Sequence, residues 1–145
     1  MIAISNRQRS RKLNLRLLKE IIAATLEELE IKDAELGIVL IGSKEMASLN
    51  EDFLGHEGPT DVITFDYSEK RKQLRGEVFV CVEVAKKQAK EFGTTGQSEI
   101  VRYIVHGILH LLGHDDLQPV ARKKMKREEE RVVRELSRRF ALSKL

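Results

Sequence analysis

Residues 106–116 read His-Gly-Ile-Leu-His-Leu-Leu-Gly-His-Asp-Asp, and this stretch contains three of the four histidines of the chain. On a helix, His106 and His110 lie one turn apart, so their imidazoles project from the same face and can bind one metal ion. The alternative is a hydrogen-bonded histidine pair in the core. Burying two imidazoles in an apolar run costs free energy unless each has a polar partner, and one metal ion satisfies both. The spacing therefore favours a metal site on a buried helix.

Candidates for a third ligand follow this helix directly. We expect Gly113 to end the helix, because a glycine just past the last helical residue adopts the left-handed conformation at little cost. The chain then turns back and brings His114, Asp115 or Asp116 towards the histidine pair. Two histidines and one further ligand leave the fourth position of a tetrahedral zinc ion open, which is the arrangement of a catalytic site.

Length and composition indicate one soluble globular domain. The chain has 145 residues, of which 41% are hydrophobic and 34% charged, enough for one core but not two. We see no apolar run long enough to span a membrane, and the basic residues near the start follow its short apolar stretch instead of preceding it, unlike an export signal. We therefore expect a single domain over residues 1–145 in the cytoplasm, with no membrane association. The single cysteine, Cys81, excludes an internal disulfide and is expected to be buried.

The charges are distributed unevenly, although the net charge is only +3. Residues 1–20 contain six basic and one acidic side chain, and residues 121–145 contain ten basic and four acidic ones, so both ends are basic and the middle is acidic. Basic ends are compatible with a polyanionic partner such as nucleic acid, and equally with solvated helix faces rich in lysine and arginine.

Hydrophobic periodicity predicts an α+β fold, in which a mixed sheet of about four strands packs with about five helices. We expect the first helix to be capped by Asn14 or by the residues just before it, two further caps at Ser43 and Ser98, and a turn over residues 68–75. We expect strands over residues 1–5, 35–43, 60–67 and 76–83, and helices over residues 13–30, 43–53, 84–92, 99–112 and from about 117 to the end.

Hydrolysis is the chemistry expected of such a site, because the metal lowers the pKa of a bound water towards about 7 and polarises the bond under attack. In the protease form of the motif a glutamate follows the first histidine and acts as the general base. Here that position is Gly107, which argues against peptide hydrolysis by that mechanism. Phosphodiester cleavage depends less on that glutamate and agrees with the basic ends.

Three segments resemble the bacterial YbeY proteins, rRNA maturation factors also described as metal-dependent endoribonucleases. They are residues 106–116, Pro59-Thr60-Asp61-Val62-Ile63-Thr64-Phe65 and Gly76-Glu77-Val78-Phe79-Val80. The resemblance covers nearly the whole chain and implies a zinc-binding α+β fold that cleaves single-stranded RNA. It also implies maturation of the 3′ end of 16S rRNA, late ribosome quality control, and association with the small ribosomal subunit and an assembly GTPase.

The chain departs from the family pattern at the third ligand. The family places a histidine ten residues after the first, where this chain has Asp116. Aspartate is a competent zinc ligand, so we predict a site of His106, His110 and Asp116, with a site of three histidines that uses His114 as the alternative. The added negative charge makes the metal a weaker Lewis acid and shifts the preference towards harder ions such as manganese.

A second departure lies in the loop before Pro59. Many family members have an arginine five residues before this proline, and this chain has Leu54, which cannot bind a phosphate. His56 or a basic residue from one of the ends could take that role, although a solvated loop histidine is the simpler interpretation of His56. Asp61 and His56 are candidate catalytic residues, and Thr60 and Asp61 are candidate substrate-binding residues. On a strand beside the metal, Asp61 could orient a ligand or a water.

Three functions remain open from the sequence. The first is a metal-dependent endoribonuclease that acts on ribosomal RNA precursors. The second is a ribosome assembly factor that acts mainly by binding, with a structural metal. The third is a hydrolase of a peptide or ester, against which Gly107 argues.

Overall fold

A mixed four-stranded sheet forms the centre of the protein. The computed structural model describes residues 1–70 and 73–145. The strand order is β1-β2-β4-β3, and β1, β2 and β4 run parallel while β3 pairs antiparallel with β4. This confirms the α+β fold with a mixed sheet. The strands are β1 (Ile2–Asn6), β2 (Asp33–Ile41), β3 (Val62–Asp66) and β4 (Gln73–Cys81).

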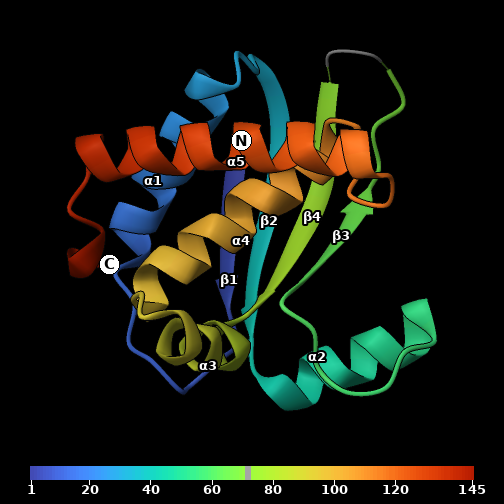
Figure 1. Ribbon diagram of the computed structural model, residues 1–145, viewed down its shortest axis with the longest axis vertical. Coiled ribbons are helices and arrows are strands. Elements are labelled where there is room, and N and C mark those ends of the chain that lie inside the picture. The colour runs from blue at the N-terminus through green and yellow to red at the C-terminus, as the bar shows by residue number, and fades with distance from the viewer. Residues whose placement is uncertain (71–72) are drawn as a thin grey trace.

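Five α-helices surround the sheet in the described ranges, and α4 lies across one of its faces with α5 packed over it (Figure 1). A short π-helical turn follows α2, and a 3-10 turn lies near the C-terminus. The helices are α1 (Leu15–Glu28), α2 (Ser43–Leu49), α3 (Val82–Phe92), α4 (Gly96–Leu111) and α5 (Pro119–Arg139), and the two turns are Asn50–Leu54 and Leu142–Lys144. No helix in the described part of the chain has the length and apolar character needed to cross a membrane.

The core divides between the two faces of the sheet, because successive strand residues point to opposite sides. On the face beneath α1 and α4, alternate residues of β2 and β4 such as Ile38 and Val78 join the larger cluster. Their neighbours Val39 and Phe79 point to the other face and pack in a smaller cluster with Met46 of α2. The larger cluster buries most of α4, as its nearly continuous apolar sequence predicted.

Close packing of α4 against the sheet depends on a glycine. A Cβ atom at Gly107 would lie 2.6 Å from Cγ1 of Val78 and 3.2 Å from Cγ2 of Thr64. The helix backbone can therefore approach β3 and β4 at this point because position 107 has no side chain. This contact fixes the face of α4 that carries the two histidines.

Two of the expected helix caps are wrong. Ser43 is the first residue of α2, and the cap position is Gly42, which has no side chain to donate or accept a hydrogen bond. Thr95 caps α4, where its hydroxyl accepts a hydrogen bond from the Ser98 amide. Ser98 returns the contact as the partner residue of a capping box. The third expected cap, Asn14, is confirmed by its hydrogen bond to the Leu17 amide.

Strand β4 begins three residues earlier than the sequence indicated. Residues 73–75 pair with Asp33–Glu35 of β2, and Arg75 lies 2.8 Å from Asp33 and 3.5 Å from Glu35. This pairing joins segments that are far apart in the chain, so the local polar composition suggested a turn. Of the predicted turn over residues 68–75, positions 71 and 72 lie outside the described residues. The last helix ends at Arg139 and does not continue to the C-terminus.

Candidate metal centre

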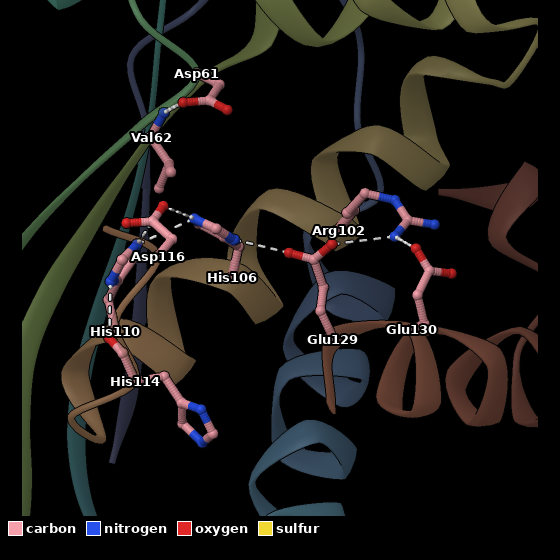
Figure 2. Close-up of polar contacts among 9 residues, drawn as sticks. All are labelled: Asp61, Val62, Arg102, His106, His110, His114, Asp116, Glu129 and Glu130. Atoms are coloured by element: carbon pink, nitrogen blue, oxygen red, sulfur yellow. Dashed lines mark hydrogen bonds and ion pairs between the residues drawn. The ribbon is translucent and has the colours of Figure 1, made fainter. Parts of the chain in front are cut away.

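The two histidines near the end of α4 face each other (Figure 2). Their Nε2 atoms are 3.1 Å apart, and the rings meet edge to face. Both side chains are about a quarter exposed, with 26% for His106 and 28% for His110. The pair is therefore fixed by the buried helix and remains open to solvent on one side.

Asp116 is the residue that joins the histidine pair. After α4, Gly113 has a left-handed conformation with φ of +96°, and the chain turns back as the sequence predicted. The Oδ2 atom of Asp116 then lies 3.6 Å from Nε2 of His106 and 3.5 Å from Nε2 of His110. Ligand atoms of a tetrahedral zinc ion with bonds of about 2.0–2.2 Å are separated by about 3.3–3.6 Å. Both distances from Asp116 fall in this range, and the two Nε2 atoms are slightly closer at 3.1 Å, so the three atoms form one candidate metal-binding group.

The hydrogen bonds of the two Nδ1 atoms determine the tautomer of each ring. Nδ1 of His106 donates to Oε1 of Glu129 at 2.7 Å, and Nδ1 of His110 donates to the backbone carbonyl of His114 at 3.1 Å. A carboxylate and a carbonyl can only accept, so both Nδ1 atoms carry the hydrogen in the neutral rings. Two Nε2 lone pairs then face each other and a carboxylate oxygen, an arrangement that a cation stabilises.

The other two candidate ligands have different contacts. His114 contributes its backbone carbonyl to His110, while its imidazole points away from the three ligand atoms (Figure 2). The Oδ1 atom of Asp115 accepts a hydrogen bond from the Leu117 amide at 2.8 Å and so fixes the turn before α5. The geometry thus brings Asp116 to the histidine pair and leaves His114 and Asp115 outside the group.

Glu129 and Arg102 belong to the same network, although the sequence reasoning missed both. Glu129 lies on α5, and its side chain is 12% exposed. Its Oε2 atom is 3.2 Å from Nη1 of Arg102, which also contacts Glu130 at 2.6 Å. A signal existed in the sequence, because Glu129 falls at a position of the apolar stripe between Met125 and Val132. A glutamate in such a stripe needs a buried partner.

The carboxylates around His106 change its protonation. Burial is the largest influence on the ring and opposes its charged form, whereas the hydrogen bond to Glu129 and the charges of Glu129, Asp61 and Asp116 favour it. The carboxylates together outweigh burial and raise the pKa of His106 above its ordinary value. The negative charge of these carboxylates therefore favours a positive charge at the ring, whether a proton or a metal cation.

A cavity of about 700 Å³ opens beside this centre, between α4 and α5, and His106, Asp116 and Glu129 contribute to its wall. Asp61, at the start of β3, lines the same cavity. Its Oδ1 atom accepts hydrogen bonds from the Val62 amide at 2.8 Å and from the Thr60 hydroxyl at 3.3 Å. The structure thus places Asp61 at the cavity, with Thr60 in contact with it.

The structure does not place the loop candidates at the cavity. His56 and Leu54 are both exposed, and neither contributes to the cavity wall. The His56 amide donates to the Asn50 carbonyl, which ties its backbone to the π-helical turn. The side chain of His56 is therefore not positioned to act at the metal centre in this conformation.

Comparison with known proteins identifies the family. The family model described as "Endoribonuclease YbeY" matches residues 3–137. Proteins named Endoribonuclease YbeY are similar to this chain: that of Elusimicrobium minutum is 36% identical and aligns with 81% of this chain and 85% of its own length. That of Thermotoga maritima is 34% identical, with coverage of 82% and 81%.

A solved structure supports the same assignment. The solution structure of a Thermotoga maritima protein superimposes with a TM-score of 0.70 at 30% sequence identity and covers 94% of this chain and 89% of its own. The family match, the relatives and the shared fold all give the same family. The chain belongs to the YbeY endoribonuclease family.

Proposed function

We propose that this protein is a metal-dependent endoribonuclease that cleaves single-stranded RNA. The observation that carries the proposal is the group of His106, His110 and Asp116, whose three ligand atoms lie within 3.1–3.6 Å of one another. His106 and Asp116 of this group line a cavity. Three protein ligands at an open cavity are typical of catalytic metal sites, whereas structural sites have four. The relatives named Endoribonuclease YbeY make RNA the substrate class to test first.

We propose zinc as the metal, because two imidazoles and one carboxylate form a common catalytic zinc set. Manganese is the first alternative, since a carboxylate in place of a third imidazole favours harder ions. A divalent cation held here supplies Lewis acidity, which stabilises negative charge on a phosphate oxygen and makes a neighbouring water easier to deprotonate.

Asp61 is the proposed positioning group across the cavity. Both hydrogen bonds of its carboxylate involve Oδ1, and within the described part of the chain Oδ2 accepts none. That oxygen can therefore orient a water or a ribose hydroxyl in the cavity. Thr60 supports this role, because its hydroxyl donates to the same carboxylate and restricts its rotation.

Position 107 argues against a protease that uses the glutamate mechanism. Gly107 faces the sheet, where even a Cβ atom would lie 2.6 Å from Val78. The position thus carries no carboxylate, and the close approach of the sheet leaves no free space for a larger side chain there. This supports the preference for phosphodiester cleavage over peptide cleavage.

Exposed cations at the start of α5 favour a polyanionic substrate. Among the described residues, the five basic side chains between Pro119 and Glu128 form no ion pairs, whereas Arg131, Arg138 and Arg139 farther along α5 do. Concentrated positive charge near a helix N-terminus is unfavourable without an anion nearby. Arg122 and Lys126 line the cavity, so we propose that they contact the RNA backbone in place of the arginine that many family members have at position 54.

The family resemblance alone carries the biological setting. We propose that the substrate is the precursor of small-subunit rRNA, with maturation of the 16S 3′ end and late ribosome quality control as the roles, in the cytoplasm. The small ribosomal subunit and an assembly GTPase are the proposed partners. Association of the purified protein with these components tests this part separately from cleavage.

The test of the activity uses zinc-loaded protein with a single-stranded RNA and a duplex of the same sequence. We expect cleavage of the single strand, its loss with a chelator, and a reduction of at least about 100-fold for His110→Ala. His56→Ala is the matched control, because it removes an exposed histidine outside the metal-binding group and should retain full activity. Equal cleavage by the wild type and His110→Ala would assign the activity to a contaminating nuclease.

One observation favours a second function, an assembly factor that acts mainly by binding. Glu129 links the metal group to α5, so the metal could serve to hold this helix in place. This alternative expects that chelation lowers the melting temperature strongly, and that ligand variants which still fold rescue ribosome maturation in cells lacking the family protein. Failure of folded His110→Ala to rescue supports the enzyme instead.

A further inference from the structure

The carboxylate of Glu129 joins two helices at the metal group. One of its oxygens accepts a hydrogen bond from Nδ1 of His106 on α4 at 2.7 Å, and the other lies 3.2 Å from Nη1 of Arg102 on the same helix. Figure 2 shows the chain of contacts from Asp116 through His106 to Glu129 and Arg102. Both carboxylate oxygens therefore have fixed donors.

Burial makes this contact more than a surface ion pair. The Glu129 residue is 9% exposed, although it carries a charge. A buried carboxylate is tolerated only when hydrogen bonds and an opposite charge replace its hydration. The His106 ring and the Arg102 guanidinium supply both, so the position of Glu129 is fixed by the two groups that it contacts.

The contact between Glu129 and Nδ1 also determines the state of Nε2, the other ring nitrogen of His106. An ionised carboxylate cannot donate, so contact with Glu129 requires the hydrogen of the neutral ring to be on Nδ1. The Nε2 lone pair is then directed towards Asp116 and His110. Hydrogen bonding of a ligand histidine to a carboxylate also makes the ring a better donor to a metal.

We propose that Glu129 is a positioning residue of the metal centre, which fixes the tautomer and orientation of His106 and strengthens metal binding through that ring. The assignment rests on the proposed metal function and names a residue on α5 that contributes to it without being a ligand. Arg102 supports the role, because it holds the second oxygen of Glu129. Within residues 1–70 and 73–145, the side chain of Glu130 pairs only with Arg102 and does not contact His106.

The test compares Glu129→Gln with Glu130→Gln, two substitutions that remove one charge each from neighbouring positions. Zinc affinity is measured by competition with a chromogenic chelator. We expect Glu129→Gln to weaken zinc binding by about 10- to 100-fold and Glu130→Gln to leave it within about twofold. Arg102→Gln keeps the carboxylate but removes one of its partners, and should give a smaller loss than Glu129→Gln.

A second measurement distinguishes a Glu129 that positions the His106 ring from one that only packs α5 against α4. Nitrogen-15 NMR of the metal-free protein at alkaline pH reports which imidazole nitrogen carries the hydrogen. We expect Nδ1–H for His106 in the wild type and a larger share of Nε2–H in Glu129→Ala. His110 serves as the internal reference, because its Nδ1 donates to the His114 carbonyl and should keep its tautomer in every variant.

The outcomes distinguish this assignment from the proposed function. If the wild type binds zinc and Glu129→Gln binds it equally well, with the His106 tautomer unchanged in Glu129→Ala, Glu129 only packs α5 and the assignment is wrong. If the wild type binds no divalent metal at all, the proposed function and the assignment both fail. Should Glu129→Gln not fold, the affinity of Arg102→Gln decides, and an affinity equal to that of the wild type contradicts the proposal.

Discussion

Gly107 of α4 lies directly against Val78 of β4, so closely that a Cβ atom at position 107 would come within 2.6 Å of Cγ1 of the valine. The same glycine directly follows His106, at the position where the protease form of the motif has its glutamate. Because the close approach holds α4 on the sheet, the position of His106 depends on it. The absence of a side chain here therefore has both a structural and a chemical consequence.

Substitution of Gly107 tests this packing. We expect Gly107→Ala to lower the free energy of unfolding by about 1–3 kcal/mol, because the gain in helix propensity is smaller than the cost of overpacking. Urea unfolding measures the change. In a Val78→Ala background the same substitution should cost clearly less, since the valine methyl groups have been removed. Equal costs in the two backgrounds would show that the two residues are not coupled.

The third ligand is tested by a pair of alanine substitutions. Asp116→Ala removes the carboxylate that lies 3.5 Å from Nε2 of His110, and we expect zinc affinity to fall by at least about 100-fold. His114→Ala keeps the backbone carbonyl that His110 contacts, so affinity should change by less than about threefold. Chelator competition measures both. A larger loss for His114→Ala would favour the alternative site of three histidines.

Substitutions of Lys126 and Lys124 test whether the RNA backbone follows the cavity. Both residues lie on α5 and carry the same charge. Lys126 lines the cavity beside the metal group, whereas Lys124 is exposed and does not. For Lys126→Gln we expect weaker binding of single-stranded RNA, and a slope of log affinity against log salt that is shallower by about 0.7. Lys124→Gln should change the slope much less. Equal effects of the two substitutions would argue against a defined path for the RNA backbone along the cavity.

The sequence predicted the sheet, the helices and the histidine pair because these depend on local patterns. The short apolar runs of β2 and β4 and the longer apolar run of α4 are visible within a dozen or so positions. The early start of β4 at Gln73 depends on pairing with Asp33, some forty residues away, and polar residues there suggested a turn. Thr95 was missed as the cap because Ser98, three residues later, has a hydroxyl suited to the same role.

The residues around the metal-binding group also divide into those that local sequence patterns predict and those that depend on contacts between distant segments. His106, His110 and Asp116 lie within eleven residues. Helix geometry and one glycine turn predicted the histidine pair with a ligand just after it, and the spacing of the family pattern favoured Asp116 over His114. Glu129 reaches His106 only because α5 crosses α4 (Figure 1), and a crossing of two helices cannot be read from either helix alone. Its place within the apolar stripe of α5 was the available signal.

The central claim is that His106, His110 and Asp116 hold one metal ion whose remaining position opens to the cavity. A crystal of the zinc-loaded protein, with anomalous data collected on both sides of the zinc absorption edge, tests it most directly. The account predicts one peak within about 2.0–2.2 Å of both Nε2 atoms and of an Asp116 carboxylate oxygen, with no fourth protein ligand. A peak that is bound by the His114 ring, closed by a fourth side chain or absent from this group would contradict it.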